Sequence, residues 1–382
     1  MDSFTFSSLE STYKGFEDPI AIIEIDNESM RDNRAGITIS DIEVDLTCGF
    51  EAAQASFCLY DCYDLIESQF QYKKIKKYTS IGSYVRVSLG YFTAAREVFR
   101  GLIVRVEYVL DDAAAPHVKV TAMDIKSIMM ANHYHKRLLA SNYSAAIKEI
   151  FSQGTYMNLI GPTNVITKLD VSDTPDVFST DVGETADSIE MVGESDYEFC
   201  VRTAKKFNYE FYCIGGQVLF RPARGDVSTL LNISNDARIF NFNVTYDITG
   251  LVGKVTVRGL DVGKAKTIES SSRHNAKISS SMSAKSLFKD STYVYVDPTI
   301  SSKIEASQRC AYIFDDMCYR FGTLDAEIIG LPEVIPGRFV SIMNMGDMAS
   351  NQFYVGQVQH RLDITGRYTT RIIGHTKSLP TI

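Results

Sequence analysis

Alternating apolar and polar residues dominate the first third of the chain. Residues 20–25, 37–46 and 55–60 alternate or run apolar between turn residues, which predicts β-strands. Two further runs of the same kind, at 82–90 and 98–108, follow. The pattern predicts a mainly antiparallel first β unit, a barrel over residues 16–124.

The same spacing of glycines and strands occurs a second time. Gly82 opens a β-type run and Gly101, nineteen positions later, opens another; Gly337 and Gly356 repeat this spacing. Upstream, residues 42–49 are echoed by residues 243–250. A repeated spacing predicts one structural unit built twice. The second β-barrel is predicted to consist of residues 238–262 and 321–376.

The middle of the chain, residues 125–237, mixes helical and strand patterns. Helices are predicted over residues 144–153, 184–192 and 194–208. In the last of these, Ser195 and Glu198 have the spacing of a helix-capping box. Two strands around a Gly-Gly turn follow.

An insertion is predicted to interrupt the second barrel over residues 263–320. It contains a Ser-rich loop over 270–286 and an amphipathic helix over 303–320, and a short tail forms residues 377–382. The predicted fold class is therefore α+β, mainly β. It comprises two similar antiparallel β-barrels, a mixed α/β middle domain and the insertion.

Composition narrows the class of protein. A chain of 382 residues predicts two or three domains. A net charge of −8 argues against a general phosphate-binding surface, although local basic patches are possible. No apolar run is long enough to span a bilayer, and the N-terminus does not have the pattern of a secretory signal. Seven cysteines without a CxxC motif favour a reducing compartment.

The sequence offers few candidates for chemistry, and we predict no catalytic, cofactor-binding or metal-binding residue and no cofactor. No GxSxG elbow is present, and residues 250–254 lack the complete phosphate-loop pattern. Each remaining candidate has a more ordinary interpretation as a core thiol, a solvated charge or a turn. These candidates are His133 with His135, Cys200 with His360, Asp111 with Asp112, the tripeptide Arg224-Gly225-Asp226 and the lysines of residues 73–77.

Three segments resemble a known family. Residues 194–212 with the Gly-Gly hairpin are similar to the motif of phage late control protein D, which recurs in the hub portion of type VI secretion spike proteins. Residues 331–340 and 354–372 resemble that family's closing strands. The likeness extends over about residues 20–374.

This resemblance implies a structural baseplate hub of a contractile tail, whether of a phage, a tailocin or another injection system. Two barrels per chain would form a homotrimeric, pseudo-sixfold ring that joins the tail tube protein to a spike on a separate chain, with other baseplate components around it. Nucleic acid or cargo would only pass through its channel. The hub would be assembled in the bacterial cytoplasm and become part of a virion-like particle, without stable membrane insertion.

Two other functions remain open from the sequence. One is a tail-associated cell-wall hydrolase, which requires a convergent catalytic constellation. The other is a module that binds host-surface glycans through its many tyrosines. Within the hub interpretation, the acidic balance predicts carboxylates along the channel wall, where they would repel DNA or an acidic cargo.

Overall fold

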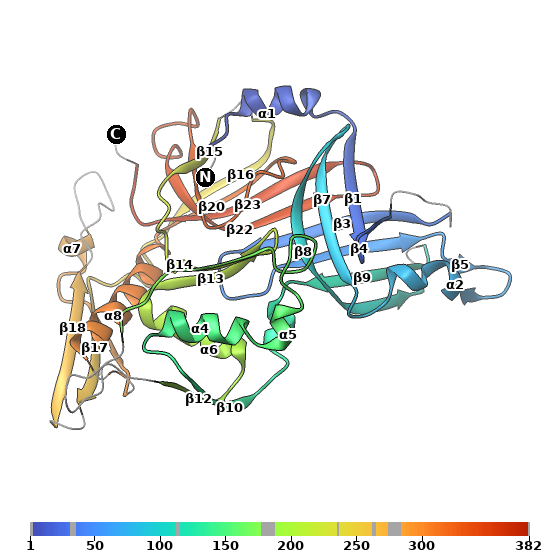
Figure 1. Cartoon of the computed structure of the whole chain (residues 1–382). Coiled ribbons are helices and arrows are strands. Elements are labelled where there is room, and N and C mark those ends of the chain that lie inside the picture. The colour runs from blue at the N-terminus through green and yellow to red at the C-terminus, as the bar shows by residue number, and fades with distance from the viewer. Residues whose placement is uncertain are drawn as a thin grey trace.

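The computed structural model describes residues 3–30, 36–111, 115–176, 188–234, 237–261, 265–273, 284–298, 300 and 302–380. Within these ranges the chain is mainly β and is organised around one large, largely antiparallel sheet (Figure 1). No helix among them is both long and apolar enough to cross a membrane.

The first unit of the sheet has the strand order β3-β4-β9-β8-β7-β1, with β2 (Glu28–Ser29) at its edge. Alternation determines its buried face: Ile42, Val44 and Leu46 of β3 are each at most 3% exposed, while the residues between them are partly exposed. The strands of the first unit are β1 (Pro19–Ile25), β3 (Thr38–Thr47), β4 (Gln54–Tyr60), β7 (Tyr84–Tyr91), β8 (Ala94–Val109) and β9 (His117–Met123).

The long connection from β4 to β7 contains a small hairpin and two short helical turns. It comprises β5 (Tyr63–Asp64), β6 (Gln69–Phe70), α2 (Tyr72–Ile75) and η2 (Lys76–Tyr78). Buried Ile75 and Tyr78 anchor these turns in the core. The lysines of residues 73–77 are therefore displayed on the surface, as expected for a solvated patch.

An N-terminal helix, α1 (Phe6–Thr12), was not predicted from the sequence. Thr5 and Ser8 form its capping box, and Phe6 and Leu9 enter the same core as the sheet. The three-residue spacing of Thr5 and Ser8, together with Phe6 and Leu9 at helical spacing, was the available signal. The turn η1 (Lys14–Phe16) follows the helix.

The second unit repeats this order as β16-β20-β23-β22, with β21 and then β15 beside β22. In Figure 1 its orange and red strands continue from the blue and cyan strands of the first unit. Strand β22 pairs with β3, so both units form one sheet and share one hydrophobic core. The strands are β15 (Thr229–Ile233), β16 (Ile239–Tyr246), β20 (Gly322–Ile329), β21 (Phe339–Ile342), β22 (Gln352–Leu362) and β23 (Tyr368–Thr376).

The middle segment lies beneath the sheet in Figure 1 and has a hydrophobic core of its own. Its elements are α3 (Lys126–Met129), β10 (Tyr134–Leu138), α4 (Tyr143–Phe151), α5 (Gly154–Met157), β11 (Lys168–Val171), β12 (Ile189–Glu194), α6 (Asp196–Phe207), β13 (Tyr209–Ile214) and β14 (Gln217–Pro222). The helix predicted over 184–192 is wrong in its described part, because Ile189–Glu194 is a strand paired with β10. Ile189 and Met191 are buried while Glu190 is exposed, a period of two that the helical interpretation overlooked. The rest of that prediction lies outside the described residues.

The insertion into the second unit begins earlier than predicted. Strand β17 (Lys254–Asp261) was assigned to the second barrel, but within the described part of the chain it pairs with β18 (Lys266–Arg273) and β19 (Thr292–Val296) in a separate sheet. Helix α8 (Lys303–Cys318) covers one face of this sheet, and α7 (Ala284–Leu287) precedes β19. Alternation identifies a strand but not its partner, so the sequence could not separate β17 from β20, the true counterpart of β4.

The Ser-rich loop predicted over 270–286 is also wrong in part. Ser270, Ser271 and Ser272 lie in β18 and pair with Val257, Thr256 and Val255 of β17. Pairing with a neighbouring strand here overrides the weak turn preference of serine. Residues 274–283, which include the centre of the predicted loop, lie outside the described residues.

Candidate functional site: a duplicated β unit and its junctions

The two predicted repeat glycines that precede a strand occupy the same turn in both units. Gly82 and Gly337 have positive φ angles of +88° and +80°. The N–H of Gly82 donates to the carbonyl of Ile103 at 2.8 Å, and that of Gly337 to the carbonyl of Val355 at 2.9 Å. Return bonds run from the N–H of Ile103 to the carbonyl of Ser83 (2.9 Å) and from the N–H of Val355 to that of Arg338 (2.8 Å).

These turns define which residues correspond across the whole sheet. Starting from Ile103 and Val355, paired residues can be followed strand by strand to β3 and β16. The first unit gives the row Ile103, Ala122, Ala55, Val44; the second gives Val355, Gly374, Leu324, Val244. Val44 thus corresponds to Val244, whereas the sequence echo matched it with Thr245. That one-residue error would place every side chain of the strand on the wrong face.

The second pair of predicted repeat glycines is not equivalent, and neither glycine opens a strand. Gly101 lies inside β8 and Gly356 inside β22. The counterpart of Gly356 is Val104. Gly356 follows Val355 and Val104 follows Ile103, the two residues that bond to the equivalent turns, and both are left unpaired at a bulge opposite the next strand, β23 or β9. Gly101 has a separate role: a Cβ there would lie 2.2 Å from the carbonyl oxygen of Met123.

The junction between the units is held by a side chain as well as by the backbone ladder. The amide nitrogen of Gln359 in β22 donates to Glu43 at 2.5 Å and to Asp45 at 3.0 Å on β3. Burial and the neighbouring Glu43 raise the pKa of Asp45 above its ordinary value. One amide thus joins two carboxylates of the other unit.

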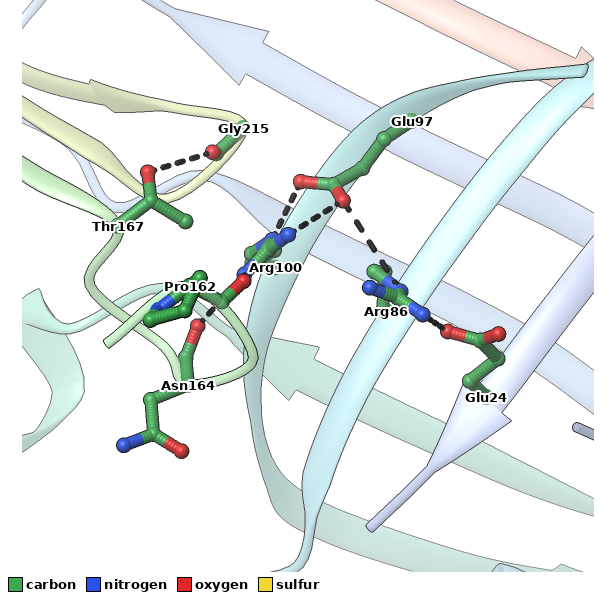
Figure 2. Close-up of polar contacts among 8 residues, drawn as sticks. All are labelled: Glu24, Arg86, Glu97, Arg100, Pro162, Asn164, Thr167 and Gly215. Atoms are coloured by element: carbon green, nitrogen blue, oxygen red, sulfur yellow. Dashed lines mark hydrogen bonds and ion pairs between the residues drawn. The ribbon is translucent and has the colours of Figure 1, made fainter. Parts of the chain in front are cut away.

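A ladder of alternating charges crosses β1, β7 and β8 on the face toward the middle segment (Figure 2). Glu24 pairs with Arg86, whose Nε lies 4.0 Å from Glu97. Glu97 accepts two hydrogen bonds from Arg100, at 2.5 and 2.8 Å. This bidentate geometry fixes the plane of the Arg100 guanidinium.

Arg100 then attaches the first unit to the middle segment. Its Nη1 donates to the carbonyls of Pro162 and Asn164 at 2.8 and 2.9 Å (Figure 2). Beside it, the N–H of Thr167 donates to the carbonyl of Gly216 at 2.8 Å and its hydroxyl to that of Gly215 at 3.3 Å. No local pattern in the sequence indicates this contact, because it joins segments about sixty residues apart.

The second unit is attached to the hairpin β13–β14 by a buried polar group. The hydroxyl of Tyr354 in β22 donates to Glu210 of β13, and the N–H of Arg224 donates to the same carboxylate at 3.2 Å. Arg221 donates to the carbonyl of Gly337 at 2.6 Å. Burial raises the pKa of Glu210, and these partners offset the cost of a buried carboxylate.

The capped helix α6 carries the main polar group inside the middle segment. Ser195 accepts from the N–H of Glu198 at 3.1 Å, and Glu198 accepts from the N–H of Ser195 at 2.7 Å. Asp196, fully buried, accepts from Tyr134 at 2.7 Å, Tyr156 at 2.6 Å and Asn132 at 2.5 Å. These bonds join the start of α6 to β10 and α5.

The weak catalytic candidates are not brought together. Cys200 is buried in the core of the middle segment, and burial raises the pKa of its thiol. His360 is buried in β22, where its ring contacts Thr370 at 3.0 Å and Tyr368 at 3.3 Å, and burial lowers its pKa to about 4. A thiol and an imidazole in separate surroundings do not form a nucleophile–base pair.

The remaining candidates also have structural partners. His135 lies 3.4 Å from Glu190 on the neighbouring strand, and the part of the chain that the structure describes holds no group of metal-ligating side chains. Asp226 of the Arg-Gly-Asp tripeptide lies 3.2 Å from the buried Arg338, while Arg224 stacks 4.0 Å over the Tyr319 ring. Asp112, one of the predicted acidic pair, lies outside the described residues.

Solved structures with the same architecture are phage tail proteins and related secretion components. A tail protein from Neisseria meningitidis MC58 matches with a TM-score of 0.63 and 11% identity, over 94% of this chain and 97% of its own. The 43 kDa tail protein of prophage MuSo2 from Shewanella oneidensis gives 0.64 and 11%, over 94% and 98%. An E. coli component of the type VI secretion system gives 0.55 and 8%, over 94% and 77%. The chain therefore shares its fold with phage tail proteins.

The family itself is shown by sequence. A search among curated proteins gave no match. The family model described as the Alg8 N-terminal domain matches residues 23–363, so the chain belongs to the Alg8 N-terminal domain family. Membership in the late control protein D family remains a prediction.

Proposed function

We propose that this protein is the structural baseplate hub of a contractile tail or injection particle. Three copies would form a ring with pseudo-sixfold symmetry around a channel, one face meeting the tail tube and the other a spike. The protein would act by matching two symmetries and would catalyse no reaction.

The observation that carries this proposal is the duplication inside one sheet. The two units share strand order, the turn at Gly82 and Gly337, and the bulge at Val104 and Gly356. Three chains with two equivalent units each present six similar surfaces to a sixfold partner but only three to a threefold one. The fold shared with phage tail proteins supports the same conclusion.

The polar interactions described above favour a structural role over an enzymatic one. The buried charges of Arg100, Glu210 and Asp196 each join two segments of the chain. A hydrolase would need a nucleophile or a general acid that faces a cleft with a suitable base. Cys200 and His360, one candidate pair from the sequence, are buried in different hydrophobic surroundings.

Native mass spectrometry and negative-stain electron microscopy of the purified protein test the proposal. We expect a mass of three chains and a ring with a central channel, with binding to the tube and spike proteins of the same particle. A monomer at high concentration that binds neither partner would contradict it. Cell-wall lysis by the purified protein, abolished by one point substitution, would instead establish a hydrolase.

The channel wall provides a second, independent measurement. We expect carboxylates to predominate there, so that DNA and acidic cargo are repelled. A density map of the ring with a basic channel lining would contradict this part of the proposal.

A further inference from the structure

The second half of the long strand, β8 in the first unit and β22 in the second, has an edge where another strand can pair. Among the described residues, this edge is occupied in the second unit but not in the first. At the internal junction, residues 357–362 of β22 pair with β23 on one side and with β3 on the other. The corresponding residues 105–109 at the end of β8 pair with β9 but with no second strand among the described residues. This stretch is an open edge of the first unit.

The second unit has the complementary open edge. Strand β3 pairs with β4 on one side and β22 on the other, whereas its counterpart β16 pairs only with β20 within the described residues. The chain thus carries both halves of a second junction of the same kind, at opposite ends of the duplicated sheet. Unpaired backbone groups on such edges favour addition of another strand.

Side chains along the open edge of the first unit are more exposed than their counterparts at the internal junction, as expected if a strand is missing there. At the internal junction His360 is fully buried and Leu362 is 8% exposed. Their counterparts are Tyr108 of β8, which is 49% exposed, and Leu110 directly after β8, which is 60% exposed. Tyr108 packs edge-on against the Phe70 ring, with 5.2 Å between the centroids, yet both side chains stay more exposed than their counterparts, whose strand has β3 beside it.

We infer that β8 of one copy pairs antiparallel with β16 of a second copy of this chain, in the register of the internal junction. The internal pairs Gln357 with Thr47, Gln359 with Asp45 and Arg361 with Glu43 fix that register. The pairs between copies are then Arg105 with Asp247, Glu107 with Thr245 and Val109 with Asn243. The inference rests on the proposed ring and specifies its subunit contact.

The polar side chains at this register are complementary. Gln359 donates to two carboxylates at the internal junction, whereas its counterpart Glu107 is an acceptor that faces the hydroxyl of Thr245 and, diagonally, the amide of Asn243. Arg105 faces Asp247, which forms an ion pair of opposite charges. Arg105 and Glu107 have side chains 61% and 43% exposed and pair with each other at 3.3 Å in the isolated chain, so both are available to a partner.

This pairing is heterologous, because the two edges are different surfaces. It therefore generates a closed ring or an open filament, and not a twofold dimer. Because the contact between copies repeats the contact within each chain, all junctions of the assembly become similar. That is the physical basis of a pseudo-sixfold ring of three chains.

Disulfide trapping tests the register. The variant Glu107→Cys/Thr245→Cys should give covalent trimers on non-reducing gels, with little background because the seven native cysteines are buried. The control Glu107→Cys/Asn241→Cys places the second thiol four residues out of register and should stay at least tenfold less cross-linked. Equal cross-linking of both variants, or none in a protein that assembles, would overturn the inference.

A charge exchange tests the same contact without cysteines. Arg105→Glu should weaken assembly at least tenfold in sedimentation experiments, and Arg105→Glu/Asp247→Arg should restore it. An unaffected ring in the single variant would overturn the inference and leave the proposed function standing. A wild-type protein that stays monomeric would instead remove the proposed function.

Discussion

Gly82 and Gly337 form the same turn with the same pair of backbone hydrogen bonds, although they lie 255 positions apart in the sequence. Both have a positive φ, which costs an L-residue roughly 1–2 kcal/mol. Their surroundings differ, because a Cβ at Gly82 would meet open space while one at Gly337 would lie 2.2 Å from the Tyr212 hydroxyl. The turn at Gly337 therefore packs against Tyr212 of the middle segment, whereas the equivalent turn at Gly82 has no such contact.

Alanine substitution separates the cost of the positive φ angle from the cost of the clash with Tyr212. Gly82→Ala should lower the free energy of unfolding by about 1–2 kcal/mol through backbone strain alone. Gly337→Ala should cost about 3 kcal/mol or more, since the clash with Tyr212 is added. Denaturant unfolding of both variants measures the difference, and equal losses would contradict the packing argument.

Arg100 is expected to be the principal polar link between the first unit and the middle segment. Arg100→Gln removes two bonds to carbonyls and leaves Glu97 without its bidentate partner, so we expect a loss of about 2–3 kcal/mol. Hydrogen exchange should rise in residues 160–167. The control Arg258→Gln breaks an exposed ion pair at 2.8 Å and should cost about 0.5 kcal/mol or less.

Buried His360 makes stability depend on pH. Its pKa in the folded protein is about 4, below the value of 6.5 expected when unfolded. The unfolded chain therefore binds the proton first, and stability falls as the pH drops from about 6.5 toward 4. Between pH 7.5 and 5.0 this amounts to about 2 kcal/mol.

Urea unfolding at the two pH values checks this expectation. His360→Gln should lose that part of the pH dependence, whatever its effect at pH 7.5. His135→Gln, at an exposed position, provides the control. An unchanged pH dependence in His360→Gln would show that another group is responsible.

The start of α6 should be sensitive in a graded way. Asp196→Ala leaves one buried and two half-buried donors without their acceptor and should cost about 3 kcal/mol. Ser195→Ala removes one cap and should cost about 1 kcal/mol. Glu198→Gln preserves the capping box and should change stability little. Thermal unfolding in which Glu198→Gln lost more stability than Asp196→Ala would contradict this assignment.

Features that depend on neighbours along the chain could be predicted from the order of the amino acids. The capping box at Ser195 and Glu198, the Gly-Gly hairpin and the alternation of the strands are local, and each leaves a pattern within a few residues. The two equivalent turns could be anticipated because Gly82 and Gly337 must adopt a conformation that other residues resist. The mainly β composition followed from the same alternation.

The pairing of the strands and the contacts between distant segments became known from the folded chain. Alternation does not identify the partner of a strand, so β17 was assigned to the second barrel, and Val44 was matched one residue away from Val244. The contacts of Arg100 with Pro162 and of Tyr354 with Glu210 join distant segments and leave no local pattern. Pairing and burial are properties of the assembled sheet, and they determine which of its edges remain open.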